Sequence, residues 1–266
     1  MSTATVADRF SIGRTARLTR WNAVLLTRNK LAFVYAIVLP LLPLLIMLAG
    51  ERGDPAVGAS SIATVFLVVG LFPVYYNVLS QFVSRRDELV LKRMRTGETR
   101  DSEMIVSIAL PGIVSALAIS AVVVPLSQLF EQPLPVNPVV YAAAAILAVI
   151  MFSAFAYWTA AWTRSAEAAQ LTSMPIILLA SLGPLGASLA DSNETLARIV
   201  EATPGAAMSE LVRVGWFGFD GPKAETTTLG FNDAWSAAAD PLIVMVVWTI
   251  VAIALAKRSM RWEPRS

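Results

Sequence analysis

The feature that most constrains this chain is the length of its segments without a charged side chain. Asp54 and Arg85 enclose 30 uncharged residues, and Glu103 and Glu131 enclose another 27. A helix needs about 20 mostly apolar residues to cross a bilayer, and a charge at mid-bilayer costs about 2.5–3.5 kcal/mol. Of the 266 residues, 56% are hydrophobic and only 15% are charged. We therefore expect an all-α integral membrane protein.

Six charge-free runs predict six transmembrane helices within a single domain, residues 1–266. The runs are Leu31–Gly50, Ser60–Ser84, Met104–Phe130, Val139–Thr163, Ala168–Ala190 and Pro241–Ala256. The last run has only 16 residues. Its helix is expected to begin about one turn earlier, near Trp235, which gives a span of 236–256.

The Lys and Arg residues predict the orientation of these spans. Of the 21 Lys and Arg, 17 lie before the first run, between the second and third, between the fourth and fifth, or after the last. Cytoplasmic loops carry an excess of these residues, so both termini are expected in the cytoplasm and residues 191–235 outside. The polar N-terminus shows no secretory signal pattern. Abundant Arg, Ala and Val are typical of a GC-rich bacterium, so we expect a bacterial cell membrane.

Residues 1–30 predict an interfacial helix on the cytoplasmic side. At 100° per residue, five arginines fall within an arc of about 140°, and the apolar residues lie mostly opposite. The arginines are Arg9, Arg14, Arg17, Arg20 and Arg28. A helix of this kind lies on anionic lipid headgroups. The alternative is a basic leader that only sets the topology.

The most charged block, RRDELVLKRMRTGE at residues 85–98, lies between the second and third runs. Read as a helix that continues from the second span, it has two faces. The polar stripe consists of Arg85, Glu88, Lys92 and Arg95, and the apolar stripe of Val83, Val90 and Met94. Thr96-Gly97 would end the helix. Such a helix is suited to docking on a soluble partner, and a solvated loop helix is the alternative.

The segment RRDELVLKRMRTGETRDSE, followed by MIVSIALPGIV, resembles the loop between the second and third spans of ABC-2-type permeases. These proteins are the membrane subunits of ATP-binding-cassette exporters. The positions that fit the family pattern are Leu91, Arg93, Met94, Arg95, Thr96 and Glu103. The family's Gly-Thr is replaced by Leu89-Val90, and its proline after the threonine is missing around Gly97-Glu98.

A second segment, ATPGAAMSELVRVGWFG, looks like the stretch that follows the fifth span in the same family. Pro204, Glu210 and Arg213 occupy the family positions, and SLGPLGASLADSNETLARI resembles the preceding exit from the fifth span. Helical spacing predicts two short helices here, Glu194–Glu201 and Ala206–Phe217, which Thr203-Pro204-Gly205 separates.

The resemblance implies a permease that works with a separate ABC ATPase subunit and a second permease chain, identical or not. ATP and Mg would be bound by the ATPase, and this chain would bind no cofactor and no nucleic acid and would not itself be an enzyme. The chain has no GxxxxGKS or GxxxxGKT phosphate loop. The implied coupling residues are Arg85, Arg86, Asp87, Glu88, Leu91, Lys92, Arg93, Met94 and Arg95.

Neutral side chains in the second span favour a lipophilic or amphiphilic substrate. The candidate path-lining residues are Phe66, Phe72, Tyr75, Tyr76 and Asn77. An ATP-independent carrier or channel is the main alternative, although charge-free spans are unusual in ion-coupled transport. A membrane-embedded enzyme is disfavoured because the chain has no His and no Cys. A membrane anchor for a signalling partner is a further alternative.

Overall fold

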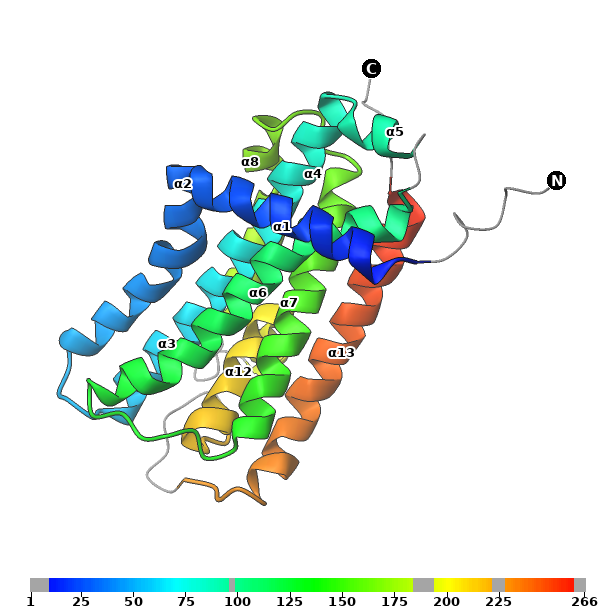
Figure 1. Cartoon of the computed structure of the whole chain (residues 1–266). Coiled ribbons are helices and arrows are strands. Elements are labelled where there is room, and N and C mark those ends of the chain that lie inside the picture. The colour runs from blue at the N-terminus through cyan, green and yellow to red at the C-terminus, as the bar shows by residue number, and fades with distance from the viewer. Residues whose placement is uncertain (1–9, 96–98, 184–193, 222–227, 261–266) are drawn as a thin grey trace.

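The computed structural model describes residues 10–95, 99–183, 194–221 and 228–260, and every regular element in these ranges is a helix. The long helices lie side by side in one bundle, and α1 (Ile12–Arg28) crosses them at one end (Figure 1). In these ranges five helical segments are long and apolar enough to cross a membrane. They are Lys30–Leu48, Pro55–Asp87, Asp101–Gln128 (α6), Pro138–Ala160 (α7) and Ala234–Ser259 (α13).

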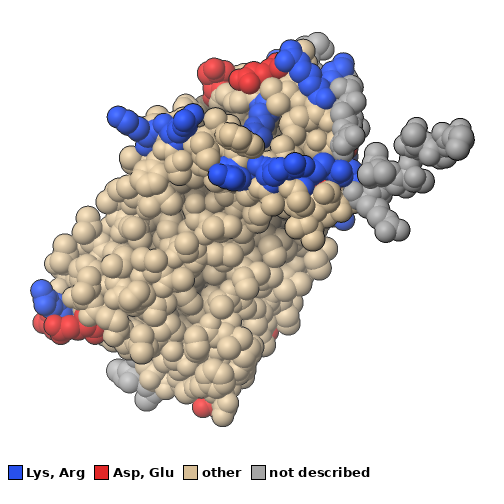
Figure 2. Space-filling view, in the orientation of Figure 1, with Lys and Arg blue, Asp and Glu red and all other residues tan. Residues whose placement is uncertain are grey.

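Charged side chains gather toward the two ends of the bundle and leave a broad uncharged band between them on the face that Figure 2 shows. We call the end that carries α1 the α1 end. The charge-free parts of these five segments form the middle of the bundle. The fold is therefore that of a helical membrane protein.

The first two spans change helix type along their length. The first consists of α2 (Lys30–Phe33), the π-helical η1 (Val34–Val38) and the 3₁₀-helical η2 (Leu39–Leu48). The second consists of α3 (Pro55–Val69), the π-helical η3 (Gly70–Tyr76) and α4 (Asn77–Asp87). Proline has no N–H to donate and its ring crowds the preceding turn. Pro43 in η2 and Pro73 in η3 therefore disturb the α-helical hydrogen-bond pattern.

The fifth expected span, Ala168–Ala190, is not one continuous helix in the described residues. It consists of α8 (Ala168–Thr172) and α9 (Met174–Ser181), a helical stretch too short to cross a membrane alone. Pro175 stands in the first turn of α9, where proline is tolerated because the N–H of that position has no helical partner. Residues 184–190 lie outside the described ranges, so a sixth span remains a prediction.

Both helices expected before the last span are present, as α11 (Glu194–Glu201) and α12 (Pro204–Phe217). The second packs against α3, α7 and α13, and nearly all of its residues are buried. This part of the expected loop 191–235 is therefore inside the bundle. The last span begins at Ala234, which confirms the early start near Trp235.

The prediction that one helix continues from the second span through Arg95 is wrong. The second span ends at Asp87, and a separate short helix, α5 (Val90–Arg95), follows. Between them Leu89 adopts a left-handed conformation with φ 60°. The turn buries Leu91 completely in the core. No sequence pattern indicates this break, because the residue in the left-handed conformation is a leucine and not a glycine.

We expect Gly112→Ala to destabilise the bundle, because α6 crosses the proline-containing η3 at this glycine. A Cβ atom at Gly112 would lie only 2.0 Å from the Pro73 carbonyl oxygen. Overpacking of this kind costs about 1–3 kcal/mol.

The matched control is Gly13→Ala in α1, where the nearest atom to the new Cβ lies at 4.0 Å. Because alanine is the better helix former, the control is expected to stabilise by up to about 1 kcal/mol. Thermal unfolding in detergent measures both, and equal effects would contradict the close contact.

Candidate functional site

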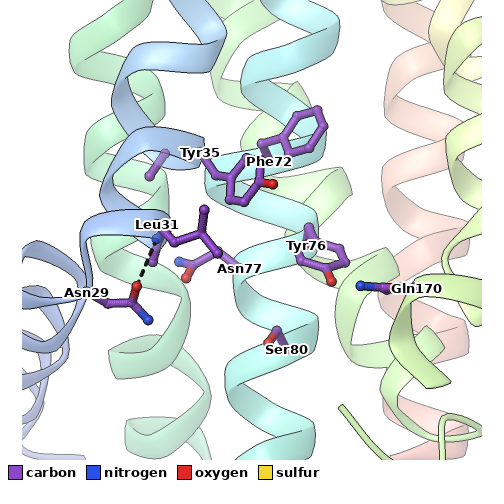
Figure 3. A pocket seen from close by; sticks show the side chains of 10 residues that line it. Asn29, Leu31, Tyr35, Phe72, Tyr76, Asn77, Ser80 and Gln170 are labelled. Atoms are coloured by element: carbon purple, nitrogen blue, oxygen red, sulfur yellow. Dashed lines mark hydrogen bonds between the residues drawn. The ribbon is translucent and has the colours of Figure 1, made fainter. Parts of the chain in front are cut away.

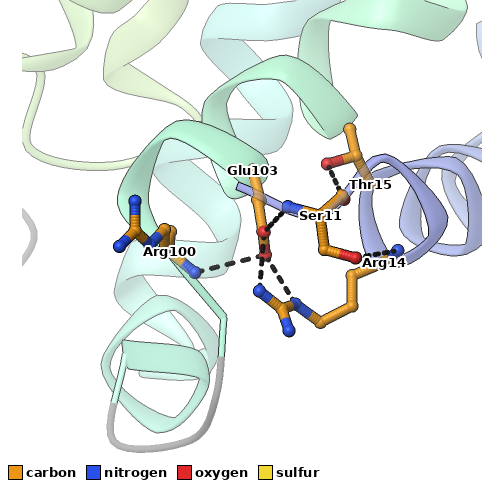
Figure 4. A network of polar contacts seen from close by, with 5 residues as sticks. All are labelled: Ser11, Arg14, Thr15, Arg100 and Glu103. Atoms are coloured by element: carbon orange, nitrogen blue, oxygen red, sulfur yellow. Dashed lines mark hydrogen bonds and ion pairs between the residues drawn. The ribbon is translucent and has the colours of Figure 1, made fainter. Parts of the chain in front are cut away.

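A buried ion pair joins α1 to the first turn of α6 (Figure 4). The Arg14 guanidinium donates from Nε to Glu103 Oε2 at 3.0 Å and from Nη2 to Oε1 at 2.9 Å. The backbone N–H of Ser11 donates to Oε1 at 2.6 Å, and that of Arg100, the N-cap of α6, donates to Oε2 at 3.4 Å. The side chain of Glu103 is fully buried. Glu103 thus holds the start of α1 against the first turn of α6.

A second polar contact ties the middle of α1 to two spans. Asn22 is buried, and its Nδ2 donates to the Ser107 carbonyl oxygen of α6 at 2.6 Å. Arg85 donates from Nη2 to Asn22 Oδ1 at 2.6 Å and to Gln81 Oε1 at 3.1 Å. Arg85 was predicted to point toward a soluble partner. In the structure it faces α1 instead.

Arg86 is fully buried at the end of the second span. Its guanidinium donates from Nη1 to the Ala160 carbonyl oxygen at 2.7 Å and from Nη2 to that of Thr163. These carbonyls belong to the last turn of α7 and the residues just after it, where a helix leaves acceptors unpaired and favours a positive charge. Arg86 therefore joins the second span to the fourth and presents no surface to a partner.

The remaining candidate coupling residues lie around the break between α4 and α5. Glu88, Lys92 and Arg93 are exposed, and Asp87 is half-buried. Leu91 is buried and Met94 packs against the core, so one side of α5 is held by the bundle. The position of the Arg95 side chain and the whole of Thr96 fall outside the described part of the chain.

The segment between α7 and α8 completes the α1 end. The Ser165 hydroxyl accepts from the Ala168 N–H at 3.2 Å and caps the first turn of α8. Hydrogen bonds from its own backbone N–H and from the Ser165 hydroxyl hold the pKa of Glu167 below its usual range. Glu167 is exposed at the surface of this end.

A cavity of about 420 Å³ lies between the first two spans and α8 (Figure 3). Phe72, Tyr76 and Asn77 border it, and Tyr35 stacks on Phe72 with ring centroids 5.9 Å apart. Asn77 Oδ1 accepts from Gln81 Nε2 at 2.7 Å, whereas its buried Nδ2 has no partner among the described residues. The residues that line the cavity carry aromatic rings, amides and hydroxyls and no charge.

The other two candidate path-lining residues lie in the core of the bundle. Phe66 packs against Tyr141 with ring centroids 5.1 Å apart, and both are buried. The Tyr75 hydroxyl donates to Thr159 Oγ1 at 3.1 Å. Neither residue borders the cavity of Figure 3. The helical spacing of the second span could not distinguish these two faces, because aromatic residues occupy both.

The motif residues Pro204, Glu210 and Arg213 all belong to α12. Pro204 follows the N-cap Thr203, whose hydroxyl accepts from the Ala206 N–H at 3.4 Å. Burial raises the pKa of Glu210 to about 7, with a smaller contribution from neighbouring carboxylates, of which Glu201 is the strongest. Arg213 opposes this rise, and its guanidinium lies 5.8 Å from the centre of the Phe219 ring.

The comparisons with known proteins give no relative: no family model matches the chain, and no curated protein matches it. In the described ranges no three His, Cys, Asp or Glu residues gather in a group that could hold a metal ion. The candidate site therefore consists of the contacts at the α1 end and the cavity between the first two spans. Sequence reasoning missed Asn22 and Thr163, because a single Asn or Thr carries no pattern.

Replacing Glu103 with glutamine is expected to destabilise the protein by about 2–3 kcal/mol. The amide has one acceptor oxygen, so it leaves the Arg14 guanidinium without a counter-charge and the four donors unequally satisfied. The control is Glu131→Gln, which removes the partner of Arg52 from a pair that is 3.6 Å long and mostly exposed. Exposed pairs contribute only about 0.2–1 kcal/mol. Similar losses for both variants in chemical unfolding would contradict a special role for the buried pair.

The raised pKa of Glu210 predicts a pH-dependent stability. A carboxyl with a folded-state pKa near 7 binds its proton more tightly in the folded protein, so its favourable contribution is lost as the pH rises from about 4.5 through 7. Glu210→Gln mimics the neutral form. The melting temperature of this variant, relative to the unsubstituted chain, is therefore expected to rise between pH 5 and pH 8. A difference that does not change with pH would show that Glu210 is not titrating in this range.

Proposed function

We propose that this chain is the membrane subunit of an ABC-2-type exporter, with its termini in the cytoplasm of a bacterial cell. The main support is α5, a short helix that lies at the α1 end, directly before the third span. One side of it is packed by Leu91 and Met94, and Lys92 and Arg93 point outward. A helix held on one side by the bundle and charged on the other is suited to receive a soluble ATPase.

In this proposal the motion of the ATPase enters the bundle through side-chain contacts, because the helix is interrupted at Leu89. Arg86 carries a displacement of this junction to the end of α7. Arg85 carries it to α1 through Asn22. The ATPase would bind ATP and Mg, and a second permease chain would complete the transport path.

The cavity of Figure 3 is the proposed start of that path. Its aromatic and amide lining suits a lipophilic or amphiphilic substrate that carries no fixed charge. An ATP-independent carrier remains the alternative, and the requirement for ATP distinguishes the two functions.

The test reverses the charges that α5 presents. In the Lys92→Glu, Arg93→Glu double variant we expect loss of co-purification with the ABC ATPase, or at least a tenfold loss of ATP-dependent dye transport into inverted vesicles. Exposed pairs contribute only about 0.2–1 kcal/mol each, so one reversal alone is insufficient. Insertion into the membrane should be unchanged.

The matched control is Lys257→Glu, Arg258→Glu, which makes the same charge change at exposed positions near the end of α13. The control variant should still co-purify with the ATPase and should still support ATP-dependent dye transport. Wild-type transport in the α5 variant, or an equal loss in the control, would overturn the assignment of α5 as the docking helix. Transport that persists without ATP would favour the carrier.

A further inference from the structure

Three arginines of α1 point away from the bundle. Arg17, Arg20 and Arg28 are exposed, and no ion pair involves them in the part of the chain that the structure describes. The helix contains no Asp or Glu. Figure 2 shows the basic side chains as a line across the bundle, at the boundary of the uncharged band. The inward-facing polar residues, Arg14 and Asn22, are by contrast held by α6 and α4. The three arginines therefore form a basic ridge that makes no ion pair with any described residue.

Large apolar side chains are exposed beside this ridge. Ile12 is 78% exposed, Trp21 68% and Leu25 59%. Exposed aliphatic residues next to basic ones, with a tryptophan among them, are typical of a helix that lies in the interface between lipid headgroups and acyl chains. In an aqueous environment these large apolar side chains would be exposed to water.

An apolar cleft of about 210 Å³ lies beneath α1, between the first span and α6. Ala23 and Leu26 of α1, Ile37 of the first span and Pro111 and Val114 of α6 contribute to its lining. Val114 is 57% exposed, so the cleft reaches the outer surface of the bundle. That surface belongs to helices long and apolar enough to cross a membrane.

The basic ridge and the cleft lie on the same helix in adjacent positions. Arg20 precedes Ala23 by three residues, a spacing that puts two side chains on one side of a helix. Thr27, another lining residue, directly precedes Arg28. A ligand that fills both features must have a negatively charged end and an apolar end.

We propose that α1 and this cleft form a binding site for anionic phospholipid, with headgroup phosphates along the ridge of Arg17, Arg20 and Arg28 and an acyl chain in the cleft. An acidic protein surface would match the arginines and leave the cleft empty. Because Asn22 links α1 to Arg85, the bound lipid is connected to the end of the second span. This site does not depend on the proposed transport function.

The test uses the full chain in nanodiscs of phosphatidylcholine and phosphatidylglycerol. The chain has no cysteine, so Thr27→Cys gives one attachment point for a fluorescent label at the cleft. Among the described residues, the Thr27 hydroxyl bonds within its own helix, to the Val24 carbonyl oxygen. We expect acyl-brominated phosphatidylglycerol to quench the label several-fold more than brominated phosphatidylcholine at the same mole fraction. Each basic residue near an anionic surface contributes up to roughly fivefold.

Substitution separates the two parts of the site. The triple variant Arg17→Gln, Arg20→Gln, Arg28→Gln should lower the quenching ratio of the two lipids to about one, as should 0.5 M salt, which screens charges. Val114→Phe, which fills the cleft, should reduce quenching by both lipids. Arg52→Gln, which removes one positive charge at the opposite end, should change nothing.

Equal quenching by both lipids in the otherwise unsubstituted chain would overturn the proposal, as would a preference that survives in the triple variant. If the lipid preference is absent and the triple variant instead loses its hold on a partner ATPase, the ridge is a protein-docking surface. That result also overturns the lipid site.

Discussion

A fully buried guanidinium, that of Arg86, determines how the bundle is closed at the α1 end. Removing a cation from water is costly unless acceptors replace its hydration, and the unpaired carbonyls at the end of α7 provide them. Since α7 also packs against α6, α12 and α13, this contact relates the second span to most of the bundle. The end of α4, the break at Leu89 and the start of α5 come directly after this anchored residue.

The arginines near this end have two different tasks. Arg14, Arg85 and Arg86 point inward and donate to a carboxylate, two side-chain amides and two backbone carbonyls. Those on the outer side of α1 have no such partner within the described residues and remain at the surface. In the middle of the bundle the helices are held by close packing and not by charged groups. They approach closely where a glycine faces a backbone carbonyl, as Gly205 does at Ala180. Hydrogen bonds and ion pairs therefore hold the helices together at the α1 end, and side-chain packing holds them together in the middle of the bundle.

The sequence predicted the helical membrane fold and most of the spans because the exclusion of charge from hydrocarbon depends on composition alone. It also predicted α11 and α12 from helical spacing and the break at Thr203-Pro204-Gly205, although α12 begins at Pro204, two residues earlier than expected. It could not predict that α12 lies inside the bundle, since its apolar face would look the same on a membrane surface. Nor could it divide the second span into a core face with Tyr75 and a cavity face with Asn77. That division depends on which helices pack against the second span, and the sequence of one helix does not show which helices pack against it.

The leucine at the break between α4 and α5 has an energetic consequence. A left-handed conformation costs a residue with a side chain about 1–2 kcal/mol, and burying one leucine returns about 1.5–3 kcal/mol. Leu89 is the residue in the left-handed conformation, and Leu91 is the leucine that is buried. The two contributions are of similar size, so the burial of Leu91 offsets the cost of the left-handed turn at Leu89.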